Sequence, residues 1–294
     1  MKEKSMTALL SCFVRAYHSK NYKYKIFNDY LAEKILSKEE FDRIELNLKS
    51  GIKFFNPNFI GDDNVALRWI VDNQLSPSVL ARSVFAEDNL KNEIRLGLKQ
   101  YLVLASGYDT SAYRVNNNIL KYEIDKQEVI DDKIKRLKQA GFNKENIYYL
   151  KCDFTDKNWI DVIINSNYDM TKKSFYSLLG ISYYLTKEDF RRMIMDISNL
   201  LSTGSVILFD YPNFNESEKE TINQKLANAA NEEMKSKYSY EDIEKFADEC
   251  NMLVYKNLNH QDIDNEYFYK YNTLNPNNKI LAPIGVNYCL IVKR

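Results

Sequence analysis

One stretch of the chain, residues 101–125, constrains the fold more than any other. It opens with an uninterrupted apolar run, Tyr101–Ala105, which predicts a fully buried strand. A turn of small residues containing Gly107 follows, and then a polar segment that can begin a helix. A second apolar stretch, Ile119–Ile124, ends in the acidic Asp125. The order strand, tight turn, helix, strand predicts a βαβ unit, and such units build parallel sheets covered by helices.

The polar residues of this unit indicate what it binds. A carboxylate at the tip of the second strand, here Asp125, is placed to accept hydrogen bonds from ribose hydroxyls. Asp109 lies two residues past Gly107, where it would repel a pyrophosphate and attract an ammonium group. The turn also lacks the full G-x-G-x-x-G pattern of dinucleotide sites. We therefore expect S-adenosylmethionine as the ligand, with a nicotinamide-dependent reductase as the less favoured alternative.

Apolar spacing divides the rest of the chain into two regions. Residues 1–100 predict mainly short helices, because Gly and Pro interrupt the helical spacing there. From residue 101 strands alternate with helices, which is typical of a parallel sheet. Strands are predicted over 101–105, 119–124, 147–152, 174–180, 205–210, 252–258 and 286–292, and helices over 111–115, 126–140, 187–201 and 239–250. The charged segment 213–238 is predicted to be an insertion that covers the ligand edge of the sheet.

Composition narrows the classes of partner. Lys+Arg and Asp+Glu are equal at 41 each, so no net field recruits nucleic acid or membrane. The longest uncharged run of strong apolar content, 174–186, is shorter than the ~20 residues that span a bilayer. The four cysteines are scattered without C-x-x-C pairs, and no cluster has metal-ligand spacing. We expect a cytoplasmic protein that binds neither metal, nucleic acid nor membrane.

Residues that directly follow the strands are the candidate ligand contacts, because ligands bind beyond the carboxyl ends of strands in open parallel sheets. Gly107 would let a ligand approach the backbone, or is an ordinary turn glycine. Asp125, with Glu123 nearby, would hold a ribose, although an Asp here is also a good helix N-cap. Asp153 and Phe154 can bind adenine through the carboxylate and the following backbone N–H, while an Asx-turn is the alternative for Asp153.

Further candidates lie outside the strand tips. Arg82 can clamp a carboxylate bidentately, or it is a solvated surface residue. The segment Leu179–Tyr184 either lines the pocket at the methyl donor or is a buried strand end. His18 and His260 could each act as a base, or could each be an ordinary surface or cap residue without a catalytic role. The aromatic residues of 267–271 either wall an apolar pocket or are core aromatics of a hairpin between the last two strands.

An ordered set of segments resembles the bacterial S-adenosylmethionine-dependent methyltransferases related to leucine carboxyl methyltransferase. The resemblance covers essentially the whole chain and is carried by Ser5–Leu9, Ile26–Asp29, Ala81–Asp88, Tyr101–Arg114, Tyr122–Asp125 and Gly180–Leu185. It implies an α/β fold: a class I methyltransferase (Rossmann-like) sheet of seven strands, the last antiparallel, in residues 101–294. It also implies an N-terminal helical cap in residues 1–100.

The resemblance also implies roles for individual residues. By position, Arg82 would hold the carboxylate of the donor, Gly107 its methionine backbone, Asp125 the ribose, and Asp153 with Phe154 the adenine. Two positions depart from the family pattern. Ala105 replaces a glycine, which is tolerable if its φ stays negative. Leu179 replaces a glutamate, which leaves the acceptor side undefined.

The expected activity is O-methyl transfer to a small molecule or peptide. A carboxylate acceptor is favoured over a hydroxyl, because a carboxylate is ionised at neutral pH and needs no base, and the chain has only two histidines. No catalytic side chain is assigned. An S-adenosylmethionine-binding protein without transferase activity is the alternative.

Overall fold

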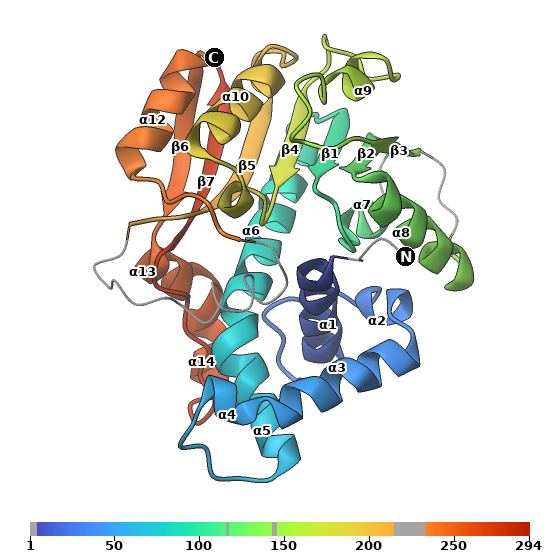
Figure 1. Cartoon of the computed structure of the whole chain (residues 1–294). Coiled ribbons are helices and arrows are strands. Elements are labelled where there is room, and N and C mark those ends of the chain that lie inside the picture. The colour runs from blue at the N-terminus through green and yellow to red at the C-terminus, as the bar shows by residue number, and fades with distance from the viewer. Residues whose placement is uncertain (1–4, 116–117, 143–145, 215–232) are drawn as a thin grey trace.

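A single seven-stranded sheet organises the molecule (Figure 1). The computed structural model describes residues 5–115, 118–142, 146–214 and 233–294. The strands are β1 (Gln100–Leu104), β2 (Leu120–Asp125), β3 (Ile147–Lys151), β4 (Ser174–Leu178), β5 (Val206–Pro212), β6 (Met252–Leu258) and β7 (Val286–Lys293). Their order is β3-β2-β1-β4-β5-β7-β6. Strands β1 to β5 pair in parallel, and β7 is antiparallel to both of its neighbours, β5 and β6. This confirms the predicted strands and the antiparallel last strand.

Helices cover both faces of this sheet. The first half of the chain contributes α1 (Met6–Asn21), α2 (Ala32–Ile35), α3 (Lys38–Ser50), α4 (Ile52–Phe55), α5 (Asp63–Ile70), the π-helical turn η1 (Val71–Leu75), α6 (Ser76–Arg95), α7 (Ser111–Arg114) and α8 (Gln127–Gln139). The second half contributes α9 (Asp161–Ile164), the 3-10 turn η2 (Ser182–Tyr184), α10 (Lys187–Ser198), α12 (Tyr240–Glu249), α13 (His260–Ile263), the π-helical turn η3 (Asp264–Phe268) and α14 (Tyr269–Leu274). No helix in these described ranges is both long enough and apolar enough to span a bilayer.

Side chains that alternate along the central strands point to opposite faces of the sheet and belong to two separate core clusters. Tyr101 and Val103 of β1 pack in one cluster with α1 and α6, while Leu102 and Leu104 pack in the other with α10 and α12. Strands β1, β4 and β5 are buried throughout, as the central strands of a covered parallel sheet must be. Figure 1 shows α1 to α5 gathered at the end of the sheet where the parallel strands finish.

The boundary at residue 100 stays a prediction, because the helices of residues 1–100 and the sheet share one continuous core cluster. Within that region α6 is the bridge: it begins among the cap helices and ends shortly before β1. Its first turn carries Pro77, directly after the π-helical turn η1. Most of the predicted insertion over 213–238, residues 215–232, lies outside the described residues.

Strands β6 and β7 pair antiparallel, as in the hairpin considered for residues 267–271, but the segment that connects them is helical. Helices α13 and α14, joined by η3, fill this connection. Phe268 and Tyr271 are buried in the core cluster that includes α1 and α6, while Tyr269 is exposed. Ile263, Phe268 and Tyr271 are buried, and their spacing along the chain fits a helical segment with one buried face.

Candidate active site

A cavity of about 560 Å³ lies along the ends of β1 to β4, between the sheet and helices α1 and α6. We call it the cleft. It is lined by all but one of the predicted site residues: Arg82, Ala105, Gly107, Asp109, Asp125, Asp153 and Phe154. These residues come from α6, from the last residue of β2, and from the segments that follow β1 and β3. The rule that ligands bind beyond the carboxyl ends of parallel strands therefore locates the cleft correctly.

The turn after β1 is left-handed at two positions. Gly107 has φ 43°, and Ala105 has φ 51°. The condition that Ala105 keep a negative φ is therefore not met, and an L-residue in this conformation costs ~1–2 kcal/mol. A side chain at Gly107 would also place its Cβ 3.1 Å from the Cβ of Ala8. Gly107 is thus required by the close packing of α1 on this turn.

Asp125 joins the tip of β2 to that turn. Its Oδ2 accepts a hydrogen bond from the N–H of Gly107 at 2.8 Å, and its Oδ1 accepts one from the N–H of Lys126 at 2.7 Å. Helix α8 begins at Gln127 with Lys126 in the N-cap position, so Asp125 is not the helix cap. Burial raises the pKa of Asp125, and the two backbone hydrogen bonds oppose that rise. A carboxylate held this way retains lone pairs for further donors.

Glu123 does not line the cleft. Its carboxylate lies 2.8 Å from the Nζ of Lys133, and both side chains are fully buried. Glu123 lies inside β2, where helix α8 covers the strand, so its charge is balanced by that helix rather than presented to a ligand. Burial raises the pKa of Glu123, while Lys133 opposes the shift. Glu123 therefore does not contribute to the cleft, contrary to the prediction.

The tip of β3 presents Asp153 and Phe154. The Oδ1 of Asp153 accepts hydrogen bonds from the backbone N–H and the hydroxyl of Thr155, at 3.0 and 2.8 Å, so the Asx-turn is present. Its Oδ2 lies 3.3 Å from the Nζ of Lys126. Phe154 is buried and packs edge-on against Trp159, with ring centroids 5.3 Å apart. The result is an apolar surface beside a partly exposed carboxylate.

Arg82 also lines the cleft and is not a solvated surface residue. Its side chain is only 18% exposed, and its Nη1 lies 3.2 Å from the Oδ2 of Asp210. Its Nη2 donates to the Oγ of Ser11 at 3.4 Å. Asp210 lies on β5 and was missed by the sequence reasoning. The signal for it was an acidic residue within the apolar run Val206–Tyr211.

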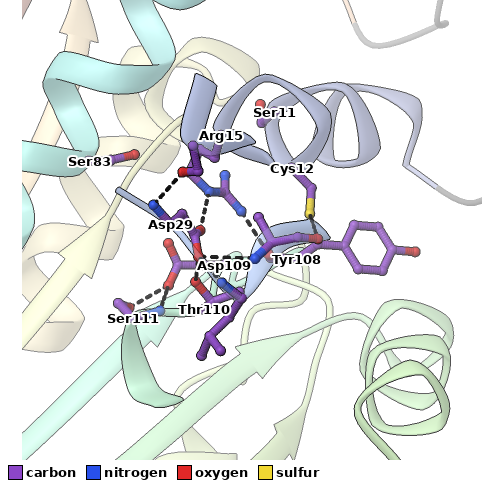
Figure 2. Close-up of polar contacts among 12 residues, drawn as sticks. Ser11, Cys12, Arg15, Asp29, Ser83, Tyr108, Asp109, Thr110 and Ser111 are labelled. Atoms are coloured by element: carbon purple, nitrogen blue, oxygen red, sulfur yellow. Dashed lines mark hydrogen bonds and ion pairs between the residues drawn. The ribbon is translucent and has the colours of Figure 1, made fainter. Parts of the chain in front are cut away.

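A second network missed from the sequence fastens α1 to the turn after β1. Figure 2 shows the guanidinium of Arg15 between Asp29 and Tyr108. Arg15 lies 2.9 Å from the Asp29 carboxylate and donates to the Tyr108 carbonyl at 2.7 Å. Arg114, 2.9 Å away, and the hydroxyl of Thr110 also contact Asp29. Burial raises the pKa of Asp29, but the two arginines outweigh burial and lower that pKa to about 2.

Asp109 lies beside this network on the wall of the cleft. Its Oδ1 accepts hydrogen bonds from the backbone N–H of Ser111 at 2.6 Å and from the Ser111 hydroxyl. Burial opposes its ionisation, yet Arg15 and Arg114 hold its pKa below the usual value. Asp109 is therefore an anion at neutral pH.

Neither histidine lines the cleft. His18 is buried in α1, and its Nε2 accepts a hydrogen bond from the N–H of Ile26 at 2.9 Å. Burial lowers the pKa of His18 to about 3. His260 begins α13, on the connection between β6 and β7. The aromatic residues of 267–271 do not line the cleft either.

The sheet order, with an antiparallel strand inserted next to the edge, defines the class of protein as a class I methyltransferase fold. Solved structures agree on this fold. A DUF574 family protein from Streptomyces avermitilis has a TM-score of 0.58 at 12% identity and covers 97% of each chain. A structure described as "a putative methyltransferase" from Thermobifida fusca has a TM-score of 0.54 at 15% identity, covering 84% of this chain and 94% of that one.

Sequence comparison defines the family. The profile of the leucine carboxyl methyltransferase family matches residues 8–198. The Bacillus subtilis protein named "Putative S-adenosyl-L-methionine-dependent methyltransferase YktD" is 34% identical over 280 residues, covering 90% of this chain and 92% of that protein. A Mycobacterium tuberculosis protein with the same description, Rv3399, is 28% identical over 158 residues, covering 52% of this chain and 43% of its own. The chain belongs to the leucine carboxyl methyltransferase family, and it is an S-adenosylmethionine-dependent methyltransferase.

Proposed function

We propose that this enzyme transfers the methyl group to a carboxylate oxygen of a small molecule or peptide. The observation that carries this proposal is the set of side chains that line the cleft. Among the described residues, it includes the cations Arg15, Arg82, Lys126 and Lys235 but no imidazole. A carboxylate with a pKa of ~4 is a nucleophile at neutral pH without help, whereas a hydroxyl needs a positioned base.

The donor-binding part of the proposal assigns each polar group of S-adenosylmethionine to one wall of the cleft. The methyl donor supplies an activated methyl group when it is bound. The residues that would hold it are Asp125 at the ribose, Asp153 and Phe154 at the adenine, the turn Ala105–Gly107 with Asp109 at the methionine amine, and Arg82 at the methionine carboxylate. Supporting this placement, all of these residues line one cavity.

The acceptor would then lie beyond the methionine end of the donor. Leu179, Tyr183 and Lys235 line the cleft there. The backbone N–H of Lys235 donates to the carbonyl of Tyr183 at 2.7 Å, which holds the two residues side by side. Lys235 adds a positive charge to this part of the lining, which would attract an anionic acceptor. Transfer then forms a bond between a carboxylate oxygen and the methyl carbon while the carbon–sulfur bond breaks, and no proton moves.

Alkali treatment of the product tests the acceptor group. Cell extract is incubated with the enzyme and methyl-labelled S-adenosylmethionine, and the product is then treated with mild alkali. A methyl ester releases volatile labelled methanol, which is the expected result. Label that survives alkali would mean an ether and would contradict the carboxylate acceptor. Asp125→Ala, which should bind the donor weakly, is the control for label incorporated by other enzymes of the extract.

The same proposal places the enzyme in the cytoplasm. All four cysteines are free, three of them buried, and free thiols persist in a reducing compartment. Measuring the methyltransferase activity in cytoplasmic and membrane fractions of the source cells tests this, and recovery of the activity only outside the cytoplasm would contradict it.

A further inference from the structure

We infer that Asp210 is a positioning residue for the methyl donor: it holds the guanidinium of Arg82 so that the remaining N–H groups of Arg82 face the donor carboxylate. This inference rests on the proposed role of Arg82. Asp210 is the acidic side chain at ion-pair distance from Arg82 in the described part of the chain. It lies on β5, behind the cleft wall, and does not itself line the cavity.

The carboxylate of Asp210 is fixed in orientation by three donors. Its Oδ1 accepts a hydrogen bond from the N–H of Gly180 at 2.6 Å. Its Oδ2 accepts hydrogen bonds from Arg82 Nη1 at 3.2 Å and from the hydroxyl of Tyr183 at 3.1 Å. The Asp210 side chain is only 1% exposed, so water does not compete for these bonds. A carboxylate bound at both oxygens presents a rigid acceptor to Arg82.

The guanidinium of Arg82 is confined on a second side by Gly180. This glycine has φ 72°, and a Cβ built on it would lie 3.0 Å from Arg82 Nη1. The guanidinium therefore packs directly over the backbone that follows β4. A guanidinium has five N–H donors in a planar fork. With one edge facing Asp210 and Nη2 near Ser11, the fork is oriented before a ligand arrives.

Charge balance makes Asp210 necessary in this chain. A buried guanidinium without a counter-ion is costly, and Leu179, at the end of β4, supplies no charge. An amide at position 210 could not replace the carboxylate. Asparagine has a single acceptor oxygen; if it faces the N–H of Gly180, its NH₂ group faces the N–H groups of Arg82. Two donors would then oppose each other, and the guanidinium would turn away.

The test compares two ligands that differ only in the carboxylate: S-adenosylhomocysteine and its decarboxylated analogue. Calorimetry gives the affinity of each for the wild type, Asp210→Asn and Arg82→Gln. We expect the wild type to prefer S-adenosylhomocysteine, and both variants to lose about tenfold or more of that preference, as for a lost charged hydrogen bond. Affinity for the decarboxylated analogue, which reports on the folded cleft, should change little. Asp153→Asn is the matched control, because it lies at the adenine end and should affect both ligands alike.

The outcomes separate the two proposals. If Arg82→Gln keeps the wild-type preference, the proposed donor orientation is wrong. If Arg82→Gln loses the preference but Asp210→Asn keeps it, Arg82 binds the carboxylate and our inference about Asp210 is overturned. Should Asp210→Asn not fold, Asp210→Glu retains the charge while moving the carboxylate by one methylene. The same loss of preference is expected of it, and an unchanged preference would overturn the inference.

Discussion

At the scale of single residues, Ala105 holds the least favourable backbone conformation of the cleft. Its φ of 51° lies in the left-handed region, which glycine adopts without cost. Ala105→Gly is therefore expected to raise the free energy of unfolding by ~1 kcal/mol. Urea denaturation measures this. Ala86→Gly, inside helix α6, is the matched control and should lower stability by a similar ~1 kcal/mol. A loss of stability in Ala105→Gly would show that the turn is not strained.

Asp125 is predicted to act through donor binding. Removing its carboxylate in Asp125→Ala should weaken S-adenosylhomocysteine binding by ~1.5–3 kcal/mol, the range for a hydrogen bond to a charged group. Isothermal titration calorimetry gives the affinity. The N–H of Gly107 also loses its partner, so far-UV circular dichroism must show intact folding first. Near-wild-type affinity in the folded variant would mean that Asp125 only fastens the turn.

The local sequence predicts strand tips better than it predicts partners. Asp125 and Asp153 could be found because a carboxylate directly after an apolar run must lie at the edge of the sheet. The pairing of Arg82 with Asp210 could not, because it joins residues 128 positions apart. Glu123 was predicted to contact the ligand because it is charged and close to Asp125. Its partner is instead Lys133, which lies on the helix that covers β2.

At the scale of elements, helix α1 depends on Asp29 for its place over the cleft. Asp29 pairs with buried Arg15 and shares Arg114 with Glu87, so Asp29→Asn leaves Arg15 without its ion-pair partner while Arg114 keeps one. We expect a loss of ~3–5 kcal/mol in the free energy of unfolding, measured by urea denaturation at neutral pH. Asp131→Asn, whose partner Lys151 is exposed, is the control and should cost ~0–1 kcal/mol.

Asp29 also predicts how stability responds to acid. Its folded-state pKa is lowered from 3.8 to about 2. A depressed carboxyl pKa stabilises the protein above pH 3.8 and loses that contribution as the pH falls toward 2. The wild type should thus lose ~2 kcal/mol across this window that Asp29→Asn does not lose. Parallel stability curves for the two proteins below pH 4 would contradict the assignment.

Strands that are apolar runs could be predicted from the sequence, whereas a segment whose structure depends on distant packing partners could not. The seven strands were each recognisable from an apolar run. The helices between β6 and β7 were not, because Tyr267–Tyr271 is equally rich in residues that favour strands. Their burial against α1 and α6, which decides the outcome, involves residues more than half the chain away.

At the scale of the whole molecule, donor binding should stabilise the fold selectively. S-adenosylhomocysteine at a hundredfold excess over its dissociation constant should add ~2.7 kcal/mol to the free energy of unfolding and raise Tm. NAD and NADP should leave Tm unchanged, because Asp109 is an anion where their pyrophosphate would lie. Thermal denaturation with each ligand measures this. A rise in Tm with NADP alone would contradict the donor site.

The position of β7 has a consequence for how the molecule is made. This strand, Val286–Lys293, lies between β5 and β6, and its Tyr288 pairs with Asp210. During synthesis β5 and β6 therefore emerge first and wait as open edges until β7 is translated and inserts between them. Unpaired edges invite aggregation. A chain that stops before residue 286 should accordingly be degraded as a misfolded protein, so nonsense mutations late in the gene are expected to act as null alleles rather than as weak ones.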